Sequence, residues 1–324
     1  MGYGKPAKPP LIKGIYVADP SAHVFDGKLY IYPSHDKDDL NASSGDGDAY
    51  NMVDYHVFSM ADINGPVTDH GVALHLKDIP WASRQLWAPD AMCRNDKCYL
   101  YFPARDRRGR FRIGVAVGDN PTGPFTPEAN PIEGSYSIDP AVFMDDDGQA
   151  YMYFGGLWGG ELEKWSNGRF DPSATEPGGN APAVAPRVAK LSDDLLSFDG
   201  APKEIQIVND TGNPVYAQSS RRFFEGAWMH KYKNYYYLSY STGDYHKIVY
   251  AIGKSPMGPF RYMGVLLTPV MGWTTHHSIV EFKDKWYLFY HDASASGGID
   301  YQRCVKVAPL EYRTDGTIRE IDPE

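Results

Sequence analysis

The sequence contains little cysteine and no long apolar segment. Its three cysteines, Cys93, Cys98 and Cys304, are too few for a disulfide framework, and their odd number leaves at least one thiol free. Cys93 and Cys98 flank a turn that permits a cross-strand contact, but we expect reduced residues within strands. No stretch approaches the roughly 18 to 20 apolar residues of a membrane span, and residues 1–14 lack the apolar region of a secretory signal. We therefore expect a cytoplasmic protein with no membrane partner.

Basic residues are outnumbered by acidic ones. The chain has 32 Lys and Arg against 41 Asp and Glu, which gives a formal net charge of −9. Such a surface repels polyanions, so we expect no nucleic-acid partner and favour a neutral small or oligomeric ligand. Glycine (32), proline (25) and tyrosine (24) are abundant instead. This composition is typical of short strands joined by many turns and argues against a helical protein.

One short phrase occurs five times along the chain. Each copy is an apolar run, a tight polar turn and then an aromatic-rich strand, which is the pattern of a β-hairpin. The copies are ADPSAHVFDGKLYIY from Ala18, APDAMCRNDKCYLYF from Ala88, IDPAVFMDDDGQAYMYF from Ile138, EGAWMHKYKNYYYL from Glu225 and HHSIVEFKDKWYLFY from His276. Their turns are expected at Asp26-Gly27, Asn95-Asp96, Asp147-Gly148, Lys233-Asn234 and Asp284-Lys285. Fivefold repetition of one supersecondary unit predicts a β-propeller.

The spacing of the repeats supports one all-β, five-bladed propeller domain over residues 1–324. Each unit takes about 65 residues, near the length of a four-stranded blade. A second phrase, Gly-Pro followed by Val or Phe, recurs at residues 64–67, 122–125 and 257–260, where it marks the turn from a third to a fourth strand. The Pro-, Gly- and Asn-rich segment 172–185 is expected to be an inserted loop. Two strand-like runs, Cys304 to Val307 and Thr317 to Ile321, are expected to close the propeller by completing a blade begun elsewhere in the chain.

Equivalent positions of the repeat should meet at the propeller axis. Asp19, Asp139, Glu225 and His276 hold that position in four of the five copies. An Asp-Pro pair at a strand start also has a purely structural explanation, but a glutamate among apolar neighbours is costly to bury without a purpose. Converging carboxylates either bind a hard cation or divide acid and base roles, as glycoside hydrolysis requires. Four tryptophans near these positions, whose indole faces suit stacking on pyranose rings, favour a sugar ligand: Trp87, Trp158, Trp228 and Trp273.

Together these motifs resemble glycoside hydrolase family 43. The resemblance covers essentially the whole chain and rests on VADPSAHVFDGKLYIYPSHD, WAPDAM, SIDPAVFMDDDGQAYMYFGG, EGAWMHKYKNYYYLSYS and HHSIVEFKDKWYLFYHD. The family consists of five-bladed propellers that include β-xylosidases, α-L-arabinofuranosidases and arabinanases. It implies an inverting reaction in which Asp19 is the general base, Asp139 orients the acid and raises its pKa, and Glu225 is the general acid. An inverting pair is expected to stand about 6.5–9.5 Å apart.

The resemblance also implies binding residues around the acids. Trp87 resembles the tryptophan that forms a wall of the sugar subsite, and Arg303 resembles a late arginine that binds substrate hydroxyls, with a structural salt bridge as the alternative. His276 resembles the histidine that holds a central calcium, directly or through water, and another divalent cation is the alternative. The family places Gly-x-Gly before that histidine, whereas residues 274–275 are both threonine here. The adjacent His277 is then a hydrogen-bonded core residue.

The expected function is an inverting exo-β-xylosidase that releases xylose from short β-1,4-xylooligosaccharides. An α-L-arabinofuranosidase that acts on arabinoxylan or arabinan fragments is the alternative within the class, and a non-catalytic carbohydrate-binding propeller is a more remote one. Homo-oligomerisation, which would narrow the pocket mouth, is a further hypothesis. The basic cluster at residues 105–110 is expected to be a solvated hairpin tip.

Overall fold

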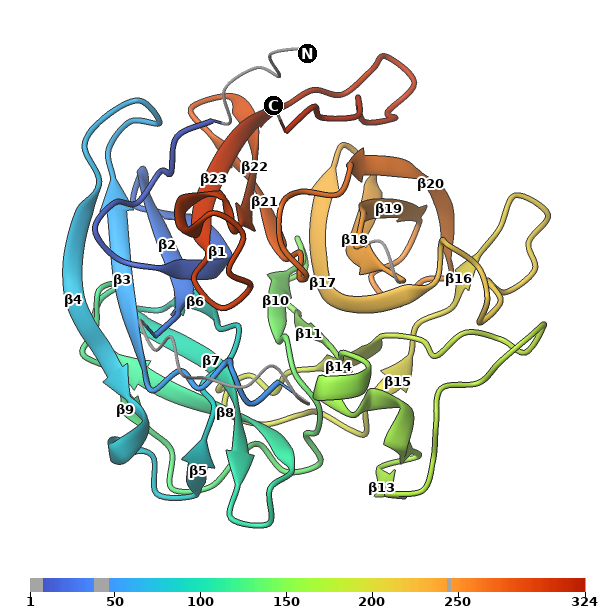
Figure 1. Ribbon diagram of the computed structural model, residues 1–324, viewed down its shortest axis with the longest axis horizontal. Coiled ribbons are helices and arrows are strands. Elements are labelled where there is room, and N and C mark those ends of the chain that lie inside the picture. The colour runs from blue at the N-terminus through green and yellow to red at the C-terminus, as the bar shows by residue number, and fades with distance from the viewer. Residues whose placement is uncertain (1–7, 38–46, 244–245, 324) are drawn as a thin grey trace.

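The regular structure is almost entirely β, and its strands form five successive sheets around one centre (Figure 1). The computed structural model describes residues 8–37, 47–243 and 246–323. The innermost strands of the five blades, β1, β6, β10, β17 and β21, contact one another in a closed ring. This arrangement confirms the five-bladed β-propeller predicted from the repeats. No helix among the described residues is long and apolar enough to cross a bilayer.

Blades one and two are each built on a four-stranded antiparallel meander. Blade one contains β1 (Val17–Phe25), β2 (Lys28–His35), β3 (Asp54–Met60) and β4 (Thr68–His75). Blade two contains β6 (Asp90–Arg94), β7 (Lys97–Asp106), β8 (Phe111–Gly118) and β9 (Thr126–Pro127), with the short β5 (Ala82–Arg84) also paired to β7.

The remaining blades vary this plan. Blade three contains β10 (Ala141–Met144), β11 (Ala150–Phe154), β14 (Arg187–Lys190) and β15 (Lys203–Glu204), interrupted by the two-stranded ribbon of β12 (Trp165–Ser166) and β13 (Arg169–Phe170). Blade four contains β17 (Phe223–Tyr232), β18 (Tyr235–Thr242), β19 (Ile248–Gly253) and β20 (Phe260–Leu267), with a parallel outer strand β16 (Ile207–Val208). Blade five contains β21 (His277–Phe282), β22 (Lys285–Asp292) and β23 (Cys304–Leu310). Short 3-10 turns occur at η1 (Leu76–Asp78), η2 (Trp158–Gly160), η3 (Leu162–Lys164) and η4 (Ser294–Ser296).

The first hairpin of every blade lies where the repeats place it. In blades one, two and five both residues of the two-residue turn adopt positive φ, for example 50° at Asp26 and 73° at Gly27, which matches the twist of the flanking strands. In blade three, residues 145–149 connect the two strands. One turn was predicted one residue too late: in blade five Lys283 and Asp284 have φ of 52° and 59°, and Lys285 already belongs to β22. The Gly-Pro phrases fall between the third and fourth strands of blades one, two and four, as predicted.

Closure of the ring differs from the sequence-based expectation. β23 simply extends its own blade by pairing with β22. The N-terminal segment lies beside it, since the backbone N–H of Leu11 donates to the carbonyl of Val305 at 2.8 Å. The last residues instead reach blade four, where Ile321 forms a parallel bridge with Leu267. Segments from both ends of the chain thus fasten the last two blades.

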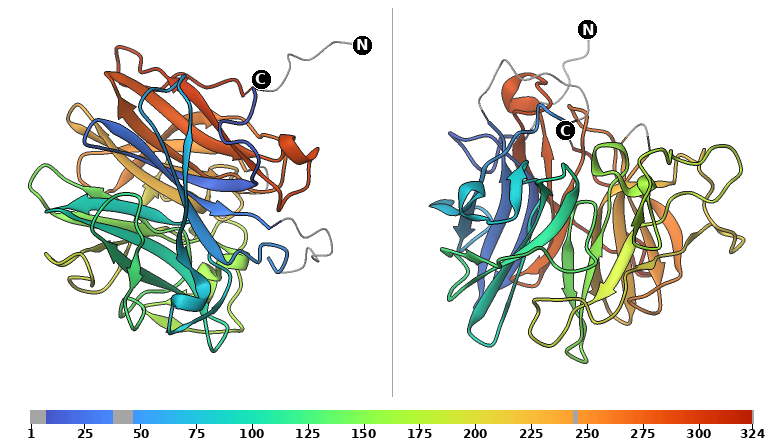
Figure 2. Two further views of the ribbon diagram at one scale, coloured as in Figure 1. Left: turned by 90° about the vertical axis from the view of Figure 1, so that its left-hand side faces the viewer. Right: turned by 90° about the horizontal axis from the view of Figure 1, so that it is seen from below.

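Aromatic residues fill the space between neighbouring blades, whose twisted sheets are seen from the side in Figure 2. Tyr101, Tyr237 and Tyr240 are fully buried. Their hydroxyls donate to the carbonyls of Leu195, Gly316 and Arg221 at 2.9, 2.7 and 2.8 Å. A buried tyrosine therefore contributes apolar area to the core while its polar end satisfies a loop carbonyl. Because a propeller has many loops whose carbonyls need donors, buried tyrosines are well suited to this fold.

Two of the cysteines form a disulfide, contrary to the expectation of reduced thiols. Cys93 and Cys98 are directly opposed in the β6–β7 ladder with a Cα–Cα distance of 4.0 Å, close enough for a cross-strand bond. Cys304 is free and buried, and its thiol donates to Asp292 at 3.0 Å.

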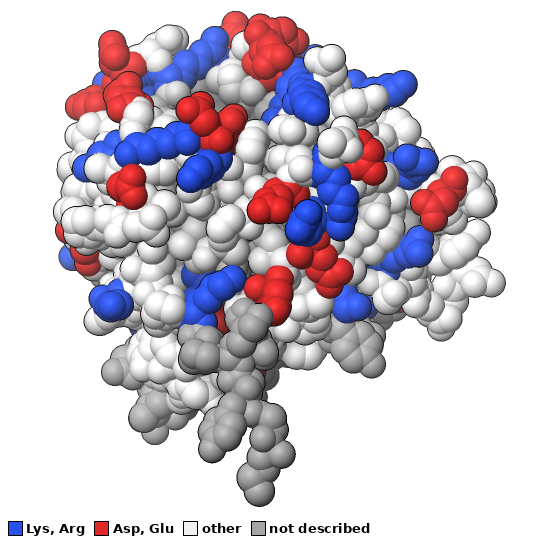
Figure 3. All heavy atoms as spheres, turned by 90° about the horizontal axis from the view of Figure 1, so that it is seen from above, with Lys and Arg blue, Asp and Glu red and all other residues white. Residues whose placement is uncertain are grey.

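On the face seen in Figure 3, acidic and basic side chains are interspersed.

Candidate active site

A pocket of about 910 Å³ opens at the centre of the ring, and all six predicted site residues line it. Asp19 lies in β1 and Glu225 in β17. Asp139 lies two residues before β10, and His276 directly precedes β21. The structure therefore brings together the equivalent repeat positions that the sequence predicted to converge. The other two predicted residues in the pocket lining are Trp87 and Arg303.

Backbone irregularities turn the three carboxylates toward the pocket. Asp19 and Asp139, each followed by proline, have φ of 51° and 58° in the left-handed region. The β1–β2 register shifts across Asp19, and the β17–β18 register shifts on both sides of Glu225. A β-bulge re-aims a side chain relative to its strand, and a left-handed non-glycine residue costs about 1–3 kcal/mol. The fold thus accepts local strain at the positions that carry the acids.

Asp19 is held as an anion by a fixed set of donors. Arg303 Nη1 donates to its Oδ1 at 3.1 Å, and the Ser34 hydroxyl donates to its Oδ2. Burial opposes ionisation, but the guanidinium of Arg303 holds the pKa of Asp19 well below its usual range. Asp19 is therefore the carboxylate of the pocket that most favours the ionised form.

Arg303 is itself fixed by a second aspartate. Its Nε and Nη2 donate to the two oxygens of Asp36 at 2.9 and 2.7 Å, and both side chains are buried. The guanidinium also lies 5.1 Å from the ring centre of Tyr50. The structural salt bridge weighed for Arg303 is therefore present, and the same side chain also lines the pocket. A bidentate pair of this kind fixes the direction of the guanidinium as well as its charge.

His291 orients the backbone at Asp19. The Asp19 N–H donates to His291 Nδ1 at 3.0 Å, and His291 Nε2 lies 3.1 Å from the carbonyl of Thr274. His291 Nδ1 also lies 3.2 Å from Asp19 Oδ1. The buried imidazole therefore contacts both the backbone and the carboxylate of the strained residue and holds the two in place.

The pKa values of the other two carboxyl groups are raised instead; Asp139 is buried and Glu225 is half-buried. Burial and the charge of Asp19 raise the pKa of Glu225 to about 8, against the opposing charge of Arg303. Burial and the neighbouring carboxylates also raise the pKa of Asp139 well above its ordinary value, although its Oδ2 accepts the N–H of Gly226 at 3.0 Å. At neutral pH the pocket therefore holds one permanently ionised carboxylate and a pair that retains a proton.

A glycine-rich loop accounts for the desolvation of Glu225. A Cβ on Gly156 would lie 3.2 Å from the Cβ of Glu225 and 2.6 Å from Ile138. The loop can approach the acid closely only because this position has no side chain. The Gly155–Gly160 segment, predicted to be a loop near the third blade, therefore helps to exclude water from the acid.

His276 lies close to two of the carboxylates. Its Nδ1 lies 3.8 Å from Asp139 and 3.9 Å from Asp19, beyond hydrogen-bonding distance. Burial lowers the pKa of His276 to about 4, so the imidazole is neutral and has a free lone pair. His277, which we expected to be the spare histidine, is fully buried, and its Nε2 lies 2.6 Å from the Ser239 hydroxyl. A neutral ligand between carboxylates suits a hydrated cation.

Trp87 forms one wall of the pocket. Its Nε1 donates to the carbonyl of Tyr50 at 2.8 Å, and its ring lies 4.6 Å from that of Phe111. A Cβ on Gly47, whose φ is 79°, would clash with the indole at 2.8 Å. The indole is therefore clamped from several sides, as a rigid binding wall requires.

A second aromatic surface lies at the pocket mouth. The rings of Trp158 and Trp273 are stacked 6.1 Å apart, and the two side chains are 45% and 44% exposed. Trp158 Nε1 donates to Glu176 Oε2 at 3.1 Å, and Arg222 pairs with the same carboxylate at 2.5 Å. Glu176 belongs to segment 172–185, which has no strand, as predicted. The inserted loop therefore orients one of the mouth tryptophans.

The expectation for the basic cluster is wrong for its first residue. Residues 107–110 do form a hairpin tip between β7 and β8, but Arg105 is only 7% exposed and lines the pocket. It donates to Gln85 at 2.6 Å and to Glu161 at 3.2 Å. The surrounding basic residues made Arg105 look like part of an exposed turn. Only the alternation of side chains along the strand, which turns Arg105 inward, distinguishes it from its neighbours.

The propeller fold and the acid cluster in its central pocket define a glycoside hydrolase. The chain belongs to glycoside hydrolase family 43, because the family model described as "Glycosyl hydrolases family 43" matches residues 10–318. The family resemblance noted from the motifs is thereby confirmed.

Several close relatives share the full length of the chain. Xylosidase/arabinosidase 43A of Humicola insolens is 59% identical over 325 residues, which cover 97% of this chain and 99% of that protein. A xylosidase/arabinosidase of Bacteroides ovatus is 56% identical over 314 residues, 96% of this chain and 97% of that protein. Among solved structures, a family 43 β-xylosidase/α-arabinofuranosidase from a compost microbial metagenome, in complex with xylotriose and in calcium-free form, has 62% identity and a TM-score of 0.95 over 97% of both chains.

Proposed function

We propose that this protein is an inverting exo-β-xylosidase that releases xylose from the ends of short β-1,4-xylooligosaccharides. The observation that carries the proposal is the pairing, in one pocket, of an ionised Asp19 with a Glu225 that retains its proton. Full-length relatives named xylosidase/arabinosidase and β-xylosidase support the choice of sugar. So does the xylotriose bound to a related structure.

In the proposed reaction the two carboxyl groups act on opposite sides of the scissile bond. Glu225 donates its proton to the glycosidic oxygen as the bond to the anomeric carbon breaks. A water molecule attacks that carbon from the other face and gives its proton to Asp19. Arg303 makes Asp19 a weak base toward free water, but the water becomes acidic as its bond to carbon forms, so the proton transfers late. Exchange with solvent then removes the proton from Asp19 and returns one to Glu225.

Asp139 is a positioning residue in this scheme. Its Oδ2 holds the N–H of Gly226, the residue directly after Glu225, and so fixes the backbone that carries the acid. Its proximity also disfavours the loss of a proton from the pair. Both effects favour a protonated Glu225 before the reaction.

Sugar binding is assigned to the walls of the pocket. Trp87 offers a clamped indole edge near the acids, and Arg303 offers a guanidinium toward substrate hydroxyls. The Trp158–Trp273 pair at the mouth suits stacking against the sugar that leaves. The wall residues near the acids and the aromatic mouth fit a substrate whose terminal unit is buried while the remainder extends outward.

α-L-Arabinofuranosidase activity is the second candidate. Two relatives at 59% and 56% identity carry both activities in their names. The two pentosides present similar hydroxyl groups to the same wall. We therefore expect arabinosidase activity to accompany xylosidase activity in one pocket.

We also propose that His276 contributes to a calcium site beneath the carboxylates. A single imidazole cannot complete the six to eight oxygen ligands that calcium prefers, so water must supply most of them. When bound, the ion would add positive charge near the anionic Asp19 and Asp139. A related structure is in calcium-free form, which supports calcium binding in close relatives.

The test is hydrolysis of 4-nitrophenyl β-D-xyloside, 4-nitrophenyl α-L-arabinofuranoside and xylobiose, with the first product followed by proton NMR. We expect xylosides to be preferred and α-xylose to form before mutarotation. A β-anomeric first product would refute inversion, and a preference for the arabinoside would make α-L-arabinofuranosidase the main activity.

Cytoplasmic localisation, single-domain organisation and homo-oligomerisation remain predictions from the sequence.

A further inference from the structure

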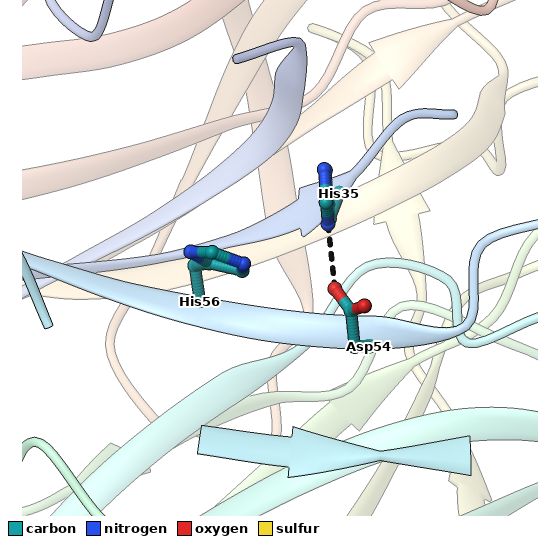
Figure 4. Close-up of side chains that lie close together, drawn as sticks. All are labelled: His35, Asp54 and His56. Carbon is teal, nitrogen blue, oxygen red and sulfur yellow. Dashed lines mark hydrogen bonds and ion pairs between the residues drawn. The ribbon is translucent and has the colours of Figure 1, made fainter. Parts of the chain in front are cut away.

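Blade one carries a cluster of potential metal ligands outside the catalytic pocket. His35 is the last residue of β2, Asp54 is the first residue of β3, and His56 follows two residues later on the same face of that strand. Figure 4 shows the three side chains turned toward one another. Among the described residues it is the only group of this kind that offers three such ligands within 4.8 Å of one another.

The cluster lies where the backbone ladder between β2 and β3 has ended. The register pairs run from Leu29 with Met60 to Ile31 with Phe58. Beyond that point the two strands are joined by the 2.5 Å hydrogen bond from His35 Nδ1 to Asp54 Oδ1. Side chains therefore replace backbone pairing at this end of the strands.

The geometry leaves a position open for a ligand. The side chains of His35, Asp54 and His56 are 26%, 14% and 15% exposed, so the cluster is neither sealed nor fully solvated. The two imidazole rings meet edge to face, with their centres 5.0 Å apart. Three converging donors with one accessible side match a metal site that keeps a water molecule as its fourth ligand.

A second carboxylate supports His56 from behind. Asp69 of β4 places both oxygens near His56 Nδ1, at 3.0 and 3.2 Å. His56 therefore carries its proton on Nδ1 and presents the lone pair of Nε2 to the cluster. Histidines that ligate metals generally donate their other N–H to a carboxylate in this way.

We infer that His35, Asp54 and His56 form a binding site for a divalent first-row transition ion, for which Zn²⁺ is the best match. Two imidazoles and one carboxylate are characteristic ligands of such ions, whereas calcium and magnesium prefer oxygen ligands alone. Ion binding separates His35 Nδ1 from Asp54, since two ligands of one zinc ion cannot lie 2.5 Å apart. The proton between them leaves Nδ1, and a neutral His35 carries it on Nε2 instead.

The site adjoins the support of the catalytic base. His35 lies between Ser34, which donates to Asp19, and Asp36, which pairs with Arg303. An ion that joins the ends of β2 and β3 would fix the strand segment from which both supports project. We therefore expect occupancy to raise the melting temperature of the protein, as any ligand specific to the folded state does.

The experiment uses tag-free protein saturated with calcium, so that Co²⁺ does not bind near His276. Co²⁺ is titrated while its visible absorption is recorded, and Zn²⁺ is then added to displace it. We expect one Co²⁺ per chain, with loss of the absorption on zinc addition. The variants His56→Gln and Asp54→Asn should bind Co²⁺ at least tenfold more weakly.

Two matched variants separate this site from others. His70→Gln removes a β4 imidazole that pairs with the Ser59 hydroxyl at 2.7 Å and lies outside the cluster. His276→Ala removes the axial imidazole. Both should retain the full Co²⁺ signal. The inference is overturned if wild-type protein takes up no stoichiometric Co²⁺, or if His56→Gln binds it as tightly as wild type. Uptake that disappears in His276→Ala would also overturn it.

Discussion

Replacement of Glu225 by alanine should affect substrates according to how much their leaving group needs a proton. Burial and the nearby charge of Asp19 give this side chain a pKa of about 8, so about nine-tenths of the molecules hold the proton at pH 7. The alkoxide that leaves xylobiose is very basic and requires that proton. The 4-nitrophenolate leaving group is stabilised by its ring and does not.

The expected magnitude follows from the contribution of a positioned general acid. Removal of such a group typically costs about 10²–10⁴-fold in rate, which corresponds to about 2.7–5.4 kcal/mol of activation free energy. We expect the loss of kcat/KM on xylobiose to lie in this range and the loss on 4-nitrophenyl β-D-xyloside to be within about tenfold. Removal of Asp19 differs, because the attacking water needs a base with either substrate.

The assay measures kcat/KM for both substrates between pH 5 and about 10, with Asp19→Asn as the matched control. Wild-type activity on xylobiose should fall as pH rises through about 8, since the protonated acid is the active form. The activity of the Glu225→Ala variant on 4-nitrophenyl β-D-xyloside should not show this decrease at high pH. Equal losses on both substrates in Glu225→Ala, or a selective loss in Asp19→Asn, would refute the division of roles.

Four further outcomes test the surroundings of the site. Glu225→Gln should be more stable than wild type at pH 8 by urea unfolding, and equally stable near pH 4, because a carboxyl with a raised pKa lowers stability as pH rises. Arg303→Met should lose roughly 3–5 kcal/mol of stability, since it leaves buried carboxylates unpaired, whereas an unchanged urea midpoint would contradict this. Glu176→Ala, which releases Trp158, should raise KM for xylotriose by roughly tenfold at most while leaving the aryl xyloside unchanged, and equal effects on both would refute the mouth subsite. Chelation should reduce kcat and calcium should restore it in wild type, but His276→Ala should not respond.

The blades and the converging acids could be predicted because both depend on local repetition. A hairpin is specified by a few adjacent residues, and the constant spacing from Asp19 to Tyr30 and from Glu225 to Tyr236 fixes equivalent positions without any knowledge of long-range contacts. Ring closure then requires those positions to meet. The convergence follows from topology alone.

The residues that support the acids could not be found in this way. Arg303 reaches Asp19 across 284 positions of sequence, and His291 reaches it across 272. Such contacts depend on which blades become neighbours and on which side of a strand each side chain faces. Ser34 and Asp36 flank His35, the last residue of β2. These two residues support the catalytic pocket, whereas His35 faces the outer cluster.

The Cys93–Cys98 bond and the burial of Arg105 were missed for a related reason. The low number of cysteines favoured reduced thiols. In the structure, however, Cys93 and Cys98 lie directly opposite each other in the β6–β7 ladder and form a disulfide. The basic run that contains Arg105 indicated a solvated tip, yet one position in it belongs to the strand and faces inward. Average tendencies of a segment do not determine the environment of one residue at its boundary.

The chemistry of the pocket depends on a departure from the symmetry of the repeats. Asp19 and Asp139 occupy the same position in their phrases and share the same left-handed backbone, so symmetry alone would give them the same pKa. One guanidinium breaks the equivalence: Arg303 is bound to Asp36 and points Nη1 at Asp19. Asp19 is ionised because it has this partner, and its charge in turn disfavours ionisation of the acids opposite. The repeats bring the acids together, and a single asymmetric salt bridge gives them different roles.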